Sequence, residues 1–118
     1  MPPYTKGFRP TELLQHFSDH GAEFGLTAVD DYVRLADALW IDPRPAHVEQ
    51  CVRMGGDTVR FDTLTNAYGV VDNFNYIRTL FVPIPCATLT PAQRAAMRPG
   101  GCHNEPDNLS YFRKRCRG

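Results

Sequence analysis

The spacing of apolar residues changes once along the chain, and this change limits the possible folds more than any other feature. Up to about residue 45, apolar side chains recur every three or four positions, as on one face of a helix. From Ala46 onward they alternate with polar residues, as in a half-buried strand. Pro43 and Pro45 separate the two regions, because proline interrupts helical hydrogen bonding. The chain is therefore expected to place helices before a sheet.

The first region predicts two helices. One spans about Thr11–His20, with Thr11 as its N-cap and Gly21 just beyond its end. The other spans Thr27 to about Trp40, and Thr27 and Asp30 have a spacing like that of a capping box.

The second region predicts four strands, which are Val48–Arg53, Thr58–Asp62, Ala67–Val71 and Tyr76–Val82. Gly55-Gly56 is typical of a tight hairpin, and the other connections are also short. Short connections imply an antiparallel meander. In the last strand Arg78 and Thr79 are expected to face opposite ways unless a β-bulge intervenes.

The remaining chain is predicted to be an irregular tail containing a short helix from Thr90-Pro91 to about Met97. The fold class expected is α+β, with two N-terminal helices packed on a four-stranded antiparallel sheet and a cysteine-linked C-terminal tail. A length of 118 residues, 42% of them hydrophobic, supports one core. We therefore expect residues 1–118 to form a single domain, with a helical part (1–45), a sheet (46–83) and a tail (84–118).

Four cysteines are present, Cys51, Cys86, Cys102 and Cys116, and four cysteines allow three complete pairings. Their spacings fit no C-x-x-C metal site, so the sequence favours a disulfide within the tail, among Cys86, Cys102 and Cys116, over free thiols. A Cys86–Cys102 bond would close a loop of about 17 residues. Cys51 is expected to lie unpaired in the sheet as a small apolar residue. The pairing itself stays undecided.

Positive charge is concentrated in the second half of the chain. The sequence has 13 basic and 13 acidic residues, and all the basic residues except Lys6 and Lys114 are arginine. Residues 1–62 hold ten acids and six bases, whereas residues 63–118 hold three acids and seven bases. Because the guanidinium group matches phosphate oxygens, the second half is the part expected to contact an anionic ligand. Ordinary surface variation is the alternative explanation.

No run of eighteen apolar residues occurs, so no membrane span is expected. The first ten residues, MPPYTKGFRP, lack the apolar region of a signal peptide. If the domain is secreted or delivered into target cells, we expect it to be part of a larger exported protein or to use a dedicated secretion machine.

His16 and His20 lie one helical turn apart, upstream of strands that carry arginine and threonine. RNA can be cleaved without a metal when a base takes the 2′-OH proton and a cation stabilises the phosphorane. Histidine suits the acid or base role near neutral pH, and arginine suits the electrostatic one. The H-x-x-x-H spacing can also bind zinc, but no third ligand is nearby in the sequence. We therefore expect neither a metal nor a cofactor.

Several ordered blocks carry a family resemblance, namely LLQHFSDHGAEFG, DYVRLADALW, GDTVRFDTLTNAYGVV and IRTLFVP. Together they resemble the small nuclease-toxin domains at the C-termini of polymorphic and contact-dependent bacterial toxins. Those domains belong to the fold group of barnase, EndoU, colicin-type RNases and RelE. The resemblance covers about Leu13 to Pro83 and leaves out the cysteine-containing tail. It implies a metal-independent ribonuclease that acts on tRNA or another cellular RNA in the target cytoplasm. A cognate immunity protein would neutralise it.

By position, the resemblance assigns catalytic roles in three blocks, to His16 and His20, to Arg60 and Thr65, and to Arg78 and Thr79. The histidines would act as acid or base, the arginines would hold phosphate, and the threonine hydroxyls would donate hydrogen bonds. Candidate substrate-binding residues are two tyrosines that can stack on bases and two arginines of the basic C-terminus, namely Tyr68, Tyr76, Arg113 and Arg115.

Each of these residues also has a purely structural interpretation. A histidine near a helix end stabilises the helix dipole, and Arg60 can pair with Asp62 on a strand surface. Thr65 can serve a turn, and Thr79 can be an ordinary strand residue. The competing functional class is therefore a non-catalytic protein-interaction domain with the same fold.

Overall fold

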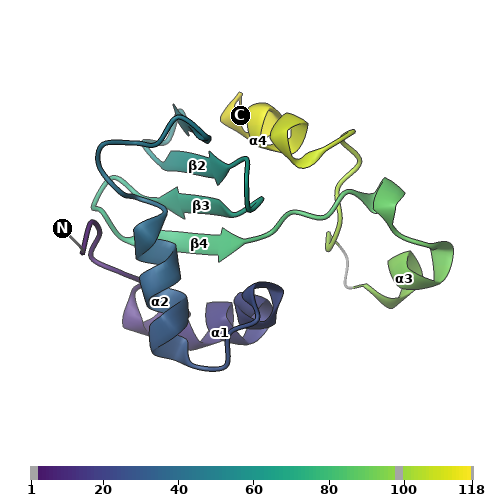
Figure 1. The fold of residues 1–118 in the computed structure, drawn as a ribbon, viewed down its shortest axis with the longest axis horizontal. Coiled ribbons are helices and arrows are strands. Elements are labelled where there is room, and N and C mark those ends of the chain that lie inside the picture. Colours follow the sequence, from purple (N-terminus) through teal and green to yellow (C-terminus); the bar gives the residue numbers. More distant parts are fainter. Residues whose placement is uncertain (1–2, 98–99, 118) are drawn as a thin grey trace.

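A computed structural model describes residues 3–97 and 100–117. Its centre is a four-stranded antiparallel sheet in the order β1-β2-β3-β4, with helices on both faces (Figure 1). The strands are β1 (Val48–Val52), β2 (Thr58–Asp62), β3 (Tyr68–Val71) and β4 (Ile77–Phe81). Each strand end lies within one residue of its predicted position, and the α+β fold class is confirmed. None of the described helices is long and apolar enough to cross a bilayer.

The two N-terminal helices are present, but their predicted caps are not. Helix α1 (Pro10–His20) begins one residue early, with Arg9 at the N-cap position and no side-chain cap. Proline favours this start because its missing N–H would have no partner in a first turn. Helix α2 (Val29–Ala38) has Ala28 as its N-cap, so the predicted capping box at Thr27 does not form. A short 3₁₀ helix, η1 (Gly21–Phe24), follows α1 directly.

Helices α1 and α2 cover one face of the sheet. Tyr32 of α2 is fully buried there, and its hydroxyl donates to the backbone oxygen of Leu80 in β4 at 2.6 Å. The C-terminal end of α2 lies very close to β3, because a Cβ added at Gly69 would stand 2.5 Å from Leu39 Cδ2. Glycine at this point therefore permits the close packing of helix on sheet.

The opposite face of the sheet is covered by a helix that the sequence analysis did not predict. Helix α4 (Asn108–Cys116) occupies the region expected to be irregular tail. The Asp107 side chain caps it by accepting from the Ser110 N–H at 2.7 Å. Its one buried residue, Phe112, stacks on Phe61 of β2 with ring centroids 5.9 Å apart. The sheet therefore has an apolar core on each side.

Both disulfides hold C-terminal segments in place, and all four cysteines are paired. Cys86–Cys102 is the tail bond whose loop length was considered above. The expectation that Cys51 is unpaired is wrong, because it is bonded to Cys116 across 65 residues of sequence. Cys51 of β1 packs with the α4 side of the sheet, so the last residue of α4 reaches it. This bond fastens α4 to the first strand.

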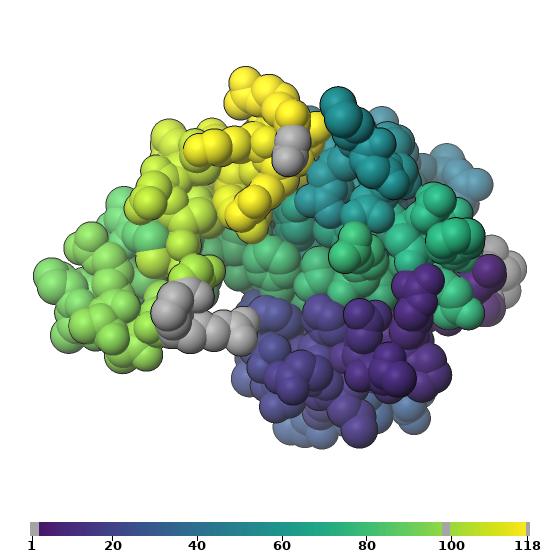
Figure 2. Space-filling view, turned by 180° about the vertical axis from the view of Figure 1, so that it is seen from behind, coloured from purple at the N-terminus to yellow at the C-terminus, as the bar shows by residue number. Residues whose placement is uncertain are grey.

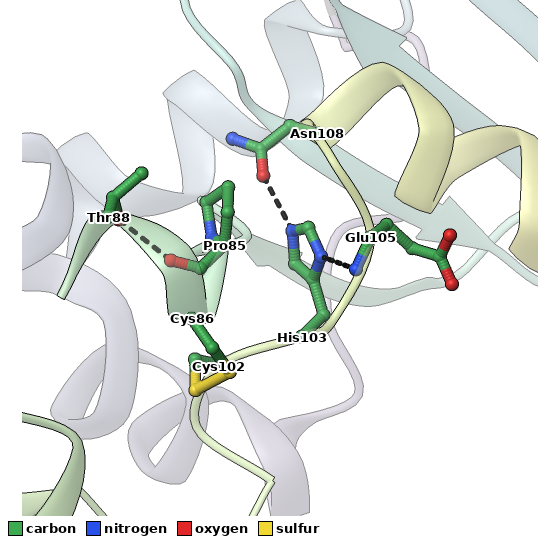
Figure 3. Close-up of a disulfide and its surroundings, with 7 residues drawn as sticks. All are labelled: Pro85, Cys86, Thr88, Cys102, His103, Glu105 and Asn108. Atoms are coloured by element: carbon green, nitrogen blue, oxygen red, sulfur yellow. Dashed lines mark hydrogen bonds between the residues drawn. A yellow bond between two sulfur atoms is a disulfide. The ribbon is translucent and has the colours of Figure 1, made fainter. Parts of the chain in front are cut away.

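Residues 83–97 and 100–101 form an arm that extends away from the sheet beyond β4 (Figure 1). The arm contains η2 (Cys86–Thr88) and α3 (Pro91–Ala96), and α3 begins with the expected cap at Thr90, in a capping box with Gln93. At its base, the Cys86 N–H donates to the His103 backbone oxygen at 2.7 Å. The Cys86–Cys102 bond joins the same two segments (Figure 3). The arm is therefore closed at its base by a covalent bond and backbone pairing.

A β-bulge changes the directions of the side chains in β4. The register passes from Val70 opposite Thr79 to Val71 opposite Ile77, so Arg78 is an extra residue in its strand. Arg78 and Thr79 consequently line the same hollow on the α4 side of the sheet. The β-bulge that the sequence analysis allowed for is therefore present, and Arg78 and Thr79 do not face opposite ways.

Candidate active-site groove

Two adjoining hollows form one groove on the α4 side of the molecule. The larger, of about 1240 Å³, lies between the end of α1, the end of β4, the arm and α4. Figure 2 shows the molecule notched between the green arm and the purple N-terminal helices. The smaller, of about 280 Å³, lies over β3 and β4 beside α4. Four residues line both hollows, so they are continuous, namely Thr79, Phe81, Tyr111 and Arg115.

His20, the last residue of α1, lines the larger hollow. Its Nδ1 lies 2.6 Å from Glu23 Oε2, and the Val82 N–H donates to Glu23 Oε1 at 2.8 Å. Because a carboxylate only accepts, the His20 Nδ1 carries the proton. In the neutral ring the Nε2 lone pair is then left to take a proton. The His20 side chain is 13% exposed, so the ring is held at the wall of the groove.

Arg78 lies in the smaller hollow and is paired there. Its Nη1 donates to Asp57 Oδ2 at 2.8 Å, and Arg53 Nη2 donates to the same oxygen at 3.1 Å. The Arg78 side chain remains 56% exposed, so the other donors of its guanidinium face solvent. Thr79, next to it, lines both hollows and links Arg78 to the His20 end of the groove.

Tyr111 of α4 forms the centre of an aromatic wall. Its ring is stacked on His103 at 4.5 Å and lies 5.5 Å from Tyr68, while the Arg115 guanidinium lies 5.1 Å from its centroid. Burial raises the pKa of the Tyr68 hydroxyl to about 12, so Tyr68 is neutral at physiological pH. Two of the predicted substrate-binding residues, Tyr68 and Arg115, therefore lie in the groove.

His103 also faces the larger hollow, but both of its ring nitrogens are in hydrogen bonds (Figure 3). Nδ1 accepts from the Glu105 N–H at 3.2 Å, which leaves Nε2 to donate to Asn108 Oδ1 at 2.8 Å. The ring therefore braces the segment that leads into α4. His20, not His103, has a ring nitrogen without such a bond among the hydrogen bonds of the described residues.

Arg60 lies on the other face of the sheet, away from the groove. Its Nη1 donates to the backbone oxygens of Leu39 and Ile41, and its Nε donates to Gln50 Oε1. The residue is 7% exposed, and burial lowers the pKa of its guanidinium. Arg60 therefore satisfies the carbonyls at the end of α2, and the structure does not bring it to Arg78.

His16 lies one turn before His20, partly buried, and its ring is stacked on the His20 ring with centroids 6.3 Å apart. Its ring lies 5.5 Å from that of Phe8, and its buried Nδ1 has no hydrogen-bond partner among the described residues. Burial lowers the pKa of His16, and the nearby His20 lowers it further. His16 is not among the residues that line the groove, although it shares a helix face with His20.

Three other predicted residues also lie outside the groove. Thr65 is in the β2–β3 turn, where its hydroxyl accepts from the Ala67 N–H at 3.3 Å. The ring of Tyr76, at the start of β4, lies 4.4 Å from the Arg9 guanidinium. Arg113 of α4 lies 3.9 Å from Glu49 of β1. The position of Thr65 agrees with its structural interpretation as a turn residue.

Glu23, Arg53 and Tyr111 line the groove but are not among the site residues predicted from the sequence. In the sequence, the pairing of His20 with Glu23 is indicated only by their spacing of three residues, which brings side chains together in a helix. Arg53 and Tyr111 reach the groove only through a hairpin and through the unpredicted α4.

Across residues 3–97 and 100–117, no cluster of three or more His, Cys, Asp or Glu side chains is arranged to hold a metal ion. Neither the known protein-family models nor the curated proteins compared with this sequence match it.

Proposed function

We propose that this protein is an endoribonuclease that cleaves RNA in the groove without a metal ion, and that it is a toxin domain of a bacterial toxin. The observation that carries the proposal is that the His20–Glu23 pair opens onto the same groove as Thr79 and Arg115, with Arg78 farther along it. A carboxylate-oriented imidazole beside guanidinium and hydroxyl donors supplies both the base and the charge stabilisation.

The cleavage step is transfer of the phosphoryl group within the RNA. His20 Nε2 takes the proton of a ribose 2′-OH, and the 2′ oxygen attacks the neighbouring phosphorus. The bond from phosphorus to the 5′ oxygen breaks, leaving a 2′,3′-cyclic phosphate, and the departing oxygen takes a proton from water. The hydroxide so formed takes the proton from His20, which restores the base. Thr79 and Arg115 lie on the His20 side of this reaction and donate to the phosphate oxygens, where negative charge increases.

The groove also has the character of a surface for single-stranded RNA. Its walls combine aromatic rings at Tyr68 and Tyr111 with guanidinium groups at Arg53, Arg78 and Arg115. Unpaired bases stack on aromatic side chains, and basic side chains follow the phosphate backbone. An unpaired loop, such as those of tRNA, therefore suits this groove better than a duplex.

The biological setting is proposed from the family resemblance. Delivery into a target bacterial cell, action on its cellular RNA and neutralisation by a cognate immunity protein all belong to that proposal. The resemblance placed the reaction between an imidazole of the leading helix and a guanidinium of the last strand, and a groove runs between His20 and Arg78.

The proposal is tested by incubating the purified protein with total tRNA in the presence of EDTA. We expect fragments ending in 2′,3′-cyclic phosphate, and we expect His20→Gln to lower the rate by about 10² to 10⁴. His47→Gln is the matched control, because His47 lies beside Asp62, outside the residues that line the groove. His16→Gln is expected to retain cleavage.

Intact RNA in the unmutated sample would contradict the ribonuclease proposal and favour the non-catalytic interaction domain. Equal rates for the unmutated protein and His20→Gln would remove His20 from the mechanism. Loss of cleavage in EDTA, with recovery on adding zinc, would favour a metallohydrolase.

A further inference from the structure

Three residues at the far end of the groove form a charged cluster that the cleavage step does not use. Asp57 Oδ2 accepts from Arg53 at 3.1 Å and from Arg78 at 2.8 Å. Both guanidinium groups line the smaller hollow, whereas Asp57 does not line it and its side chain is 15% exposed. The carboxylate therefore lies behind the two cations and holds them at the hollow.

This arrangement leaves uncompensated positive charge at the hollow. Two adjacent guanidinium groups repel each other, and one carboxylate offsets only one of their two charges. Arg115 adds a third guanidinium from the opposite wall. Arg78 uses one donor on Asp57 and keeps the rest available, and guanidinium donors match the oxygens of a phosphate group. The hollow is thus built to receive an anion.

The cluster is also separate from the reacting end of the groove. His20 and Glu23 line the larger hollow only, and Arg53 and Arg78 line the smaller one only. Thr79 and Arg115 lie where the hollows meet. A phosphate placed between His20 and Arg115 would therefore leave Arg53 and Arg78 free to bind another phosphate farther along the same RNA chain.

We infer that Arg53 and Arg78 form a binding subsite for the phosphate group adjacent to the scissile one along the RNA chain, and that Asp57 positions the pair. This inference rests on the proposed function, because it assigns the scissile phosphate to the His20 end. Such a subsite would make the enzyme favour substrates that carry at least two phosphates. It would also add affinity that does not depend on base identity.

The test uses 2′-deoxy dinucleotides, which cannot be cleaved by this mechanism because they lack the 2′-OH. Affinities are measured by NMR titration for one dinucleotide without a terminal phosphate, with a 5′-phosphate and with a 3′-phosphate. For the unmutated protein we expect about a tenfold gain in affinity from the phosphate at one of the two ends. Arg53→Gln and Arg78→Gln are expected to reduce that gain to less than twofold.

Asp57→Asn tests the positioning role, and it is expected to lower the gain while leaving the affinity for the unphosphorylated dinucleotide nearly unchanged. The matched controls are Arg34→Gln and Asp31→Asn, which disrupt another arginine–aspartate pair on α2, outside the groove. Both controls should keep the full gain. Circular dichroism of each variant verifies that it is folded, and Arg78→Lys provides a milder change that keeps the charge.

A gain at neither end, or a gain that persists in both arginine variants, would overturn the inference. Because the readout is binding, it is independent of cleavage. Cleavage of tRNA without an arginine-dependent gain leaves the ribonuclease proposal standing and removes the subsite. An arginine-dependent gain in a protein that leaves tRNA intact retains the phosphate site and removes the ribonuclease proposal.

Discussion

Glu23 accepts hydrogen bonds at both of its oxygens, from His20 on one side and from the backbone of Val82 on the other. It therefore ties the end of α1 to the segment that follows β4. Because Glu23 is itself fixed by the Val82 backbone, its bond to His20 Nδ1 limits the time that the base spends in unproductive orientations. Glu23 is a positioning residue in the proposed mechanism, since it acts on the RNA through His20.

Glu23→Gln is expected to lower kcat for RNA cleavage by about 10² while leaving KM nearly unchanged, because it disturbs the orientation of the base and not the binding surface. Steady-state kinetics on a short single-stranded RNA measure both quantities. Glu12→Gln, an exposed carboxylate in the first turn of α1, is the control. An increase in KM alone would show that Glu23 serves binding instead.

Arg60 is expected to serve stability and not catalysis. Arg60→Met leaves the backbone oxygens of Leu39 and Ile41 without their donor, so we expect the free energy of unfolding to fall by about 2 to 4 kcal/mol. Urea unfolding measures the change, and cleavage assays below the unfolding transition should show a normal kcat. Loss of cleavage with unchanged stability would contradict this expectation and indicate that Arg60 binds phosphate.

His16 should make stability depend on pH. Because burial lowers the pKa of His16 in the folded protein, the unfolded chain binds a proton first as the pH falls. The free energy of unfolding should therefore decrease as the pH falls from about 7 through the unfolded value near 6.5, and level off below the folded pKa. His16→Phe should reduce this decrease in urea unfolding at pH 7.5 and 5.5. An unchanged pH dependence in the variant would contradict the assignment.

Among the elements, α4 depends most on covalent attachment. Its apolar contact with the sheet centres on Phe112, and Cys116 fastens its end to β1. Replacing Cys51 and Cys116 together by alanine should lower the free energy of unfolding by about 3 to 4 kcal/mol, since it releases a long loop. It should also weaken RNA binding, because α4 carries Tyr111 and Arg115. Urea unfolding and RNA titration measure these two effects.

Replacing Cys86 and Cys102 by alanine is the comparison for that variant, because the smaller loop should cost less stability and leave α4 in place. A thiol count on this variant, denatured and unreduced, should find no free thiol, because Cys51 and Cys116 are its remaining cysteines. Two free thiols would contradict the Cys51–Cys116 bond.

The strands were predictable from sequence because one alternating pattern fixes both their extent and their inward faces, as at Val59 and Phe61. Helix α4 was not, because NLSYFRKRC places a single buried apolar residue among basic ones and gives little helical periodicity. The sequence allowed for a bulge at Arg78 but did not predict one, because a register shift depends on how the neighbouring strand pairs.

At the scale of the whole molecule, the groove is assembled from segments far apart in sequence. His20, Thr79 and Arg115 come from the first helix, the last strand and the last helix. The sequence identified these residues by chemical type but also proposed His16 and Arg60, which lie on similar periodic positions. Only the tertiary fold separates the two sets, because His16 shares a helix face with His20 but packs beside Phe8, and a strand residue one position away faces the other side of the sheet.

Because the arm is closed at its base, we expect the molecule to tolerate changes in the length of the arm. The Cys86–Cys102 bond and the pairing of Pro85 with His103 hold the two ends of the intervening segment together, so we expect a change in its length to move neither β4 nor α4. The same loop borders the mouth of the groove at Met97. Insertions there should alter which RNA loops are admitted, while the sheet and its chemistry stay as they are.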